Sequence, residues 1–120
     1  ENAVATILKP NPFETIAASS GIINVSETSH GRSTGDTVRF RGTPSTSGNF
    51  TNPGSFDGIA GSNVAKAAGY SITVGKRDSS GTITRTTDFY HFTVDTDTAT
   101  SGGKSGGGEN CSAGPATLTA

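Results

Sequence analysis

The six residues Phe89–Val94, which read FYHFTV, give the strongest strand signal in the chain. Tyr90, Phe92 and Val94 share one face of an extended chain, because successive side chains of a strand point to opposite sides. His91 lies on the other face, and aromatic and β-branched residues fit a pleated surface well. The stretch therefore predicts a strand covered at least partly on both faces, and a fold built around a sheet.

Shorter runs of the same kind lie on both sides of this strand. Their apolar residues alternate with polar ones, which is the pattern of a half-buried strand. The clearest are Gly21–Glu27 (GIINVSE), Thr37–Arg41 (TVRFR), Tyr70–Lys76 (YSITVGK) and Thr82–Thr86 (TITRT), with Phe13–Ala17 (FETIA) as a further candidate. Asn63–Ala68 is expected to form no more than a turn of helix, because so short a helix needs packing support.

Polar turns separate these runs. His30, Gly31, Gly35 and Asp36 are predicted to be structural turn residues, because glycine takes a positive φ without steric cost and Asp often closes a turn. A hydrogen bond within the turn is the expected role of His30. Arg77–Gly81 is predicted to be a hairpin turn with Gly81 at a positive φ.

The predicted fold class is all-β, a small antiparallel β-barrel or sandwich of about six or seven short strands with extended termini. Residues 1–12 are expected to form an N-terminal arm or edge strand, because Pro10 and Pro12 interrupt an apolar run. Residues 13–100 are predicted to be the β domain. Residues 101–120 are predicted to be a Gly-rich linker and a C-terminal segment with weak strand character.

Composition argues against several classes of partner. The net charge is −1 and the basic residues are scattered, so no basic surface for nucleic acid is expected. No apolar run approaches the ~20 residues of a membrane helix. The single cysteine, Cys111, can form neither an intrachain disulfide nor a zinc site. With hydrophobic residues at only 30%, the core is expected to be modest.

No catalytic constellation is predicted. His30 and His91 are the only histidines, and no nucleophile motif accompanies either of them. Asp88, Asp95 and Asp97 could supply oxygen ligands to calcium, but acidic residues at strand ends more often cap turns. The expectation is a protein that is not an enzyme and has no catalytic residue, cofactor or metal.

Aromatic residues in polar surroundings are the candidate contacts with a partner or a glycan. Phe50 and Phe56 lie in a polar stretch, residues 42–62, which is longer than most loops of compact domains. Tyr70 and His91 on strands complete this set of candidate contact residues. Each aromatic residue also has a simpler role open to it, which is to fill the core.

Most of the chain resembles a recurrent bacteriophage domain, which is itself similar to a small β-barrel domain of ubiquitin-activating enzymes. The resemblance depends on the order of several short motifs between about residues 12 and 108. They are Asn11-Pro12-Phe13, Ser19-Ser20-Gly21, Ile23-Asn24-Val25, His30-Gly31, Thr34-Gly35-Asp36-Thr37-Val38-Arg39-Phe40, Phe56-Asp57-Gly58-Ile59, Tyr70-Ser71-Ile72-Thr73-Val74, Tyr90-His91-Phe92-Thr93-Val94, Ala99-Thr100 and Gly106-Gly107-Gly108. The chain departs from the family in its single copy of the domain and its longer loop after Gly42.

The resemblance implies a non-enzymatic structural protein of the virion, tail-associated or on the head surface. Its expected partners are other virion proteins and further copies of itself, with no nucleic acid and no membrane. The resemblance supplies no active site. The alternative is a glycan-binding module for attachment to a host cell surface, which the aromatic loop motivates.

Overall fold

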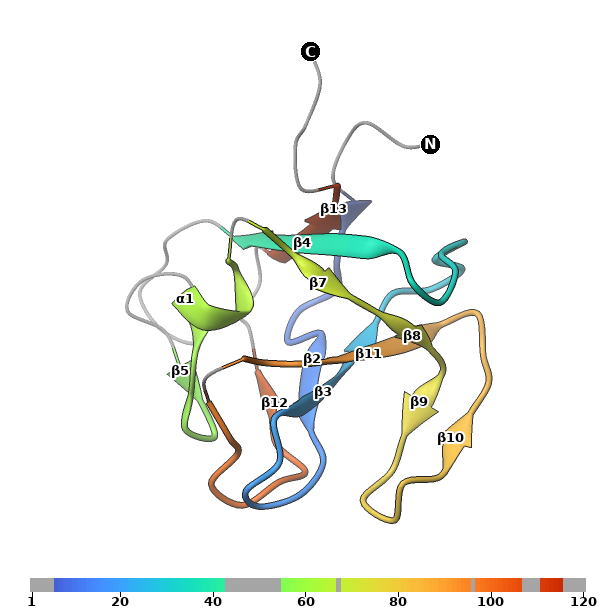
Figure 1. The fold of residues 1–120 in the computed structure, drawn as a ribbon. Coiled ribbons are helices and arrows are strands. Elements are labelled where there is room, and N and C mark those ends of the chain that lie inside the picture. The colour runs from blue at the N-terminus through green and yellow to red at the C-terminus, as the bar shows by residue number, and fades with distance from the viewer. Residues whose placement is uncertain (1–5, 43–54, 67, 96, 107–110, 116–120) are drawn as a thin grey trace.

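The computed structural model describes residues 6–42, 55–66, 68–95, 97–106 and 111–115 (Figure 1). These residues form two antiparallel sheets that face each other as a sandwich, not a closed barrel. The four-stranded sheet has the order β1 (Thr6–Ile7), β13 (Cys111–Gly114), β4 (Thr37–Gly42) and β7 (Tyr70–Ser71). The five-stranded sheet has the order β12 (Ser105–Gly106), β2 (Phe13–Thr15), β3 (Ile22–Ser26), β11 (Phe89–Thr93) and β8 (Thr73–Val74).

Three smaller elements complete the described part of the chain. β9 (Lys76–Arg77) pairs with β10 (Ile83–Thr84), and β5 (Ser55–Phe56) pairs with β6 (Ile59–Ala60). One helical turn, α1 (Gly61–Val64), follows β6 directly. The all-β class predicted from the sequence is confirmed.

Aromatic rings fill the space between the two sheets. Phe40 of β4 packs against Phe13 of β2 edge to face, with ring centroids 5.1 Å apart. The same ring stacks on Phe92 of β11 at 5.0 Å, and Phe92 in turn lies 4.6 Å from the ring of Tyr70. Each such pair adds about 1 kcal/mol beyond the area that it buries. The alternation in FYHFTV therefore places Tyr90, Phe92 and Val94 in the core, as predicted.

The predicted strand Tyr70–Lys76 is divided into three pieces. β7 pairs with β4 in one sheet, whereas β8 pairs with β11 in the other. Between them, buried Ile72 donates its N–H to Asp36 O (3.0 Å) and accepts from Gly35 N (2.9 Å), so a turn occupies its backbone. After Gly75, whose φ is +116°, the chain enters the β9–β10 hairpin. The single run Tyr70–Lys76 thus crosses between the two sheets and contributes one strand to each.

The outer face of the five-stranded sheet carries a row of polar residues. Register places Glu14 opposite Asn24, Asn24 opposite His91, and His91 opposite Thr73. Asn24 and His91 are nevertheless buried. The β9–β10 hairpin lies over them as a third layer. This layer covers the outer face of β11, which was predicted to be covered on both faces.

The segment predicted to be a Gly-rich linker differs from that expectation. β12 pairs with β2, and β13 lies between β1 and β4 with Cys111 and Ala113 fully buried. Residues 105–106 and 111–115 therefore belong to the sandwich. Glycine-rich composition indicated flexibility, but glycine also permits close approach of two backbones: a Cβ added at Gly102 would lie 2.5 Å from the Cα of Ala17.

The two ends of the described chain lie side by side. Thr6 of β1 pairs with Ala113 of β13, so the chain enters and leaves the domain at one pole, at the top of Figure 1. We call this the proximal pole. At the opposite end lie the turns at residues 16–21, 78–82 and 100–104, which we call the distal pole (Figure 1).

Candidate functional site

The Asp57 carboxylate organises one side of the distal pole. It accepts hydrogen bonds from the Thr15 hydroxyl (2.7 Å), from the Ser101 N–H and hydroxyl (3.0 and 2.9 Å), and from the Gly102 N–H (2.8 Å). Partial desolvation opposes ionisation, but these hydrogen bonds prevail and lower the pKa of the Asp57 carboxyl to about 2. Asp57 therefore joins the β5–β6 hairpin, β2 and the turn at 100–104 into one body.

Asp78 likewise fixes the turn of the β9–β10 hairpin by accepting hydrogen bonds. Its Oδ1 accepts from the N–H groups of Ser80 and Thr82, both at 2.9 Å. Its carbonyl accepts from the N–H of Gly81, whose φ of +90° matches the predicted positive value. The tip of the hairpin is thus held in one shape by its own side chain, as Asx turns are.

The hairpin is fastened to the sheet by side chains that bond to backbone. The Asn24 Nδ2 donates to Arg77 O (2.7 Å) and its Oδ1 accepts from Arg77 N (2.9 Å). His91 Nδ1 lies 2.8 Å from Gly75 O, so that nitrogen carries the proton and donates it. The Asn24 amide thus bonds to both the N–H and the carbonyl of Arg77, as the backbone of a neighbouring strand would.

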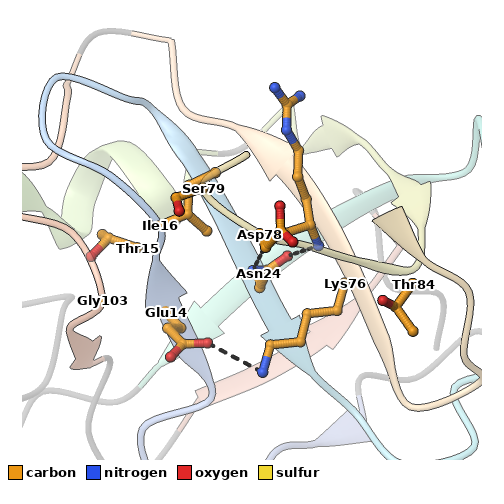
Figure 2. Close-up of a pocket in the computed structure, with 10 residues that line it drawn as sticks. Glu14, Thr15, Ile16, Asn24, Lys76, Asp78, Ser79, Thr84 and Gly103 are labelled. Carbon is orange, nitrogen blue, oxygen red and sulfur yellow. Dashed lines mark hydrogen bonds and ion pairs between the residues drawn. The ribbon is translucent and has the colours of Figure 1, made fainter. Parts of the chain in front are cut away.

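A cleft of about 250 Å³ opens between the hairpin and the outer face of β2 and β3. Figure 2 shows Glu14 and Lys76 pointing toward each other at one end, with Asn24 and Asp78 between that pair and Ser79. Thr84 lies on the hairpin side of the cleft, and Ile16 and Gly103 line it from the opposite side (Figure 2).

The charges in this cleft are weakly paired. Lys76 Nζ lies 3.6 Å from Glu14 Oε1, and both side chains are more than a third exposed. That separation exceeds the 2.7–2.9 Å of a strong charge-assisted hydrogen bond. Lys76 Nζ also lies 4.7 Å from the centroid of the Phe89 ring. The pair costs little to separate, so both charges remain available to a ligand.

A second charged cluster lies near β13, and it is buried. Arg32 donates to both carboxylate oxygens of Glu27 (3.0 and 3.2 Å), and the Tyr90 hydroxyl donates to Glu27 Oε1 (2.6 Å). Arg32 also reaches Ala113 O in the other sheet (3.3 Å). Burial and the Glu27 carboxylate raise the pKa of Tyr90 far above its ordinary value. These hydrogen bonds link residues of both sheets, so the cluster joins the two sheets.

Both histidine rings form hydrogen bonds with backbone groups. His30 Nδ1 accepts from the Arg32 N–H (2.9 Å), so its Nε2 carries the proton and donates it to Phe89 O (3.2 Å). His91 is occupied with Gly75 as described above. Burial raises the pKa of the Cys111 thiol to about 12, which keeps it protonated and unreactive at neutral pH.

The predicted turn residues lie in turns. Gly31 and Gly35 have φ values of +66° and +97°. Asp36 accepts from the Ser33 N–H through Oδ2 (2.9 Å), and its own N–H donates to Ser33 O (3.0 Å). These residues form the connection between β3 and β4, away from the cleft.

The candidate contact residues are not brought together. Phe50 lies outside the described residues, and the structure describes only the backbone of Phe56, in β5. Tyr70 and His91 lie in the interior, 6% and 7% exposed. The Tyr70 ring faces the core and the His91 ring faces the hairpin, so neither ring is accessible to a partner in solution.

Sequence reasoning missed the residues that shape the distal pole. Asn24 and Asp57 bond to residues 53 and 42 positions away, and nothing local in the sequence marks such partners. The Asp57-Gly58 pair is a turn signal, and Asp57 does take a positive φ of +50°. Its four hydrogen bonds, however, follow from the fold.

The acidic residues weighed as calcium ligands have other partners. Asp95 forms an ion pair with Lys66, and Asp97 Oδ2 accepts from Asn63 Nδ2 at 2.9 Å. Within the described ranges, no group of three or more metal-ligating side chains is found. A search of the same residues finds no helix with the length and apolar character needed to cross a membrane.

Comparisons with protein-family models, with curated proteins and with solved structures find no match for this chain.

Proposed function

We propose that this chain is a non-catalytic structural domain of a bacteriophage virion, in the tail or on the head surface, which acts through protein–protein contacts. The observation that favours this role is the arrangement of the two poles. Both ends of the described chain lie at the proximal pole, so the distal pole faces away from them and is open to contact with other proteins (Figure 1). Such a module suits a long structural polypeptide or a symmetric assembly.

The rigidity of the distal pole supports the proposal. Asp57 and Asp78 fix the turns there with hydrogen bonds to backbone N–H groups. A surface that is already ordered loses less conformational entropy on binding, so more of its contact energy appears as affinity. Assembly in turn stabilises a domain with a modest core by mass action.

The environments of the two histidines and of the Cys111 thiol support a non-catalytic role. His30 and His91 are occupied with backbone carbonyls, and Cys111 is buried and protonated. None of the three is poised as a base or a nucleophile in the described structure. Among the described strands, β1 and β7 are the edges of one sheet and β12 and β8 are the edges of the other, and edge strands are suited to assembly by strand addition.

Immunogold electron microscopy of purified phage particles, with an antibody against this domain, tests the proposal. Label on the tail or on the head is expected and distinguishes the two locations. Particles without label, alongside protein that is abundant in the unassembled fraction, contradict the proposal. Light scattering of the purified chain tests the expected self-association independently.

A further inference from the structure

The cleft between the β9–β10 hairpin and β2–β3 has the chemistry of a small binding site. Its rim carries carboxylates, an ammonium group and hydroxyls, from Glu14, Asp78, Lys76, Ser79 and Thr84. Most of its exposed lining is nevertheless apolar, and Ile16 contributes to it. An apolar surface beside a few directed polar groups is typical of small-molecule sites.

The charged residues that line the cleft indicate which class of ligand it can bind. The lining includes two acidic side chains, Glu14 and Asp78, and two basic ones, Lys76 and Arg77. Their formal charges cancel, so the cleft has no net attraction for a strong anion or cation. It offers acceptors and donors side by side, which suits a neutral ligand whose groups both donate and accept hydrogen bonds.

The polar groups are fixed before any ligand arrives. Asp78 uses Oδ1 for its own turn, which orients Oδ2 as the acceptor that a ligand hydroxyl can reach. The Asn24 amide holds the backbone of Arg77 and thereby fixes the width of the cleft. Glu14 and Lys76 are oriented by each other without being tightly bound. Preorganisation of this kind lowers the entropic cost of binding.

We infer that this cleft binds one neutral sugar ring through its hydroxyl groups. Glu14 and Asp78 accept from ligand hydroxyls, Lys76 and Thr84 donate to ring or hydroxyl oxygens, and Ile16 contacts a C–H face. The volume of about 250 Å³ lies below the roughly 300–1,000 Å³ of sites for drug-sized ligands. One ring therefore fits, with the rest of a glycan extending into solvent. This role goes beyond assembly and does not depend on it.

The affinity for a single sugar is weak, because none of the residues that line the cleft is aromatic. Without a stacking ring, a few exposed hydrogen bonds give dissociation constants of about 1–50 mM. Useful attachment by such a site comes from many copies on one particle, as multivalent binding provides. A virion-borne domain meets that requirement.

The test is a titration of the full ¹⁵N-labelled chain with glucose, galactose, mannose and N-acetylglucosamine, each to about 500 mM, followed by NMR. We expect at least one of them to shift the amide signals of Ile16, Arg77, Ser79 and Gly103 in a saturable way. Glu14→Gln, which keeps the shape of the side chain, is expected to weaken that binding about tenfold.

Asp95→Asn provides the matched control, because it also neutralises one exposed carboxylate but lies outside the cleft. It is expected to leave the titration unchanged. The absence of saturable shifts with all four sugars overturns the inference. So do shifts that map away from the cleft, or an equal loss of binding in both variants. None of these outcomes bears on whether the domain is found in particles.

Discussion

Arg32 and Glu27 show how a single ion pair can join two sheets. Glu27 follows β3 of the five-stranded sheet, and Arg32 reaches from the next turn to the carbonyl of Ala113 in the four-stranded sheet. The two side chains are 17% and 6% exposed, so water screens them little. The Tyr90 hydroxyl completes the coordination of Glu27 from within the core.

Replacing Arg32 with Met is therefore expected to lower the free energy of unfolding by about 3 kcal/mol, because it leaves a buried carboxylate without its charge partner. Urea unfolding at neutral pH measures this change. Lys66→Gln is the control, since Lys66 pairs with Asp95 at the surface and its loss is expected to leave the unfolding midpoint nearly unchanged. Equal effects of the two variants contradict the importance of the buried pair.

Asp57 gives the fold a defined sensitivity to acid. The pKa of its carboxyl is about 2 in the folded protein, against about 3.9 in an unfolded chain. A lowered pKa means that the contribution to stability is complete above pH ~4 and is lost as the pH falls toward ~2. Asp57→Asn removes this contribution at all pH values.

The expected result is a difference in urea midpoint between the wild type and Asp57→Asn that is largest at neutral pH. The difference should shrink between pH ~4 and ~2, where the wild-type carboxyl takes up its proton. Comparing the two proteins at each pH cancels the titration of the other acidic residues. A difference that stays constant over this range shows that Asp57 does not act through its charge.

Among the elements, the β9–β10 hairpin is held to β3 by two hydrogen bonds from one side chain, Asn24. Asn24→Ala removes both hydrogen bonds to the Arg77 backbone and leaves those backbone groups without that partner. We expect a loss of stability of about 2 kcal/mol and faster amide hydrogen exchange at Arg77. Ser79→Ala, at the exposed tip, should change neither quantity. Unaltered exchange at Arg77 in Asn24→Ala indicates that the hairpin is held by other contacts.

Strands whose apolar residues alternate are the elements that the sequence predicts best. β3, β4 and β11 lie within or close to the predicted runs, because each has one face in a core that its own residues build. β12 lies where a linker was expected, and near β13 the sequence predicted only weak strand character. Their residues are small, and their positions in the sheets depend on distant partners: β12 joins the edge of one sheet beside β2, and β13 pairs with β4, about 70 residues earlier in the chain.

The candidate site was harder to predict than the fold. The cleft is formed by residues from β2, β3, the β9–β10 hairpin and the turn near Gly103, and no local pattern joins them. The division of Tyr70–Lys76 between two sheets creates the hairpin that covers Asn24. Periodicity reports which face of a strand is buried, but it does not report which sheet the strand joins.

At the scale of the whole molecule, the sandwich needs its C-terminal strand. β13 lies between β1 and β4, and Cys111 and Ala113 are part of the core. A chain that ends at Gly106 is expected to lose cooperative unfolding in urea, whereas one that ends at Pro115 keeps it. Cooperative unfolding of the shorter chain is the result that would favour a domain limited to residues 13–100.

The neighbouring chain ends also decide how the domain responds to mechanical force. Tension applied through the two ends pulls β1 and β13 apart from their open end. Thr6 separates from Ala113 first, then Ile7 from Ser112, and then the Leu8 N–H from Cys111 O, one bond after another. Bonds that break singly resist less than bonds loaded together, so this pair yields before the aromatic core. Under tension the domain is therefore expected to lengthen first at this strand pair, while the rest of the sandwich stays closed.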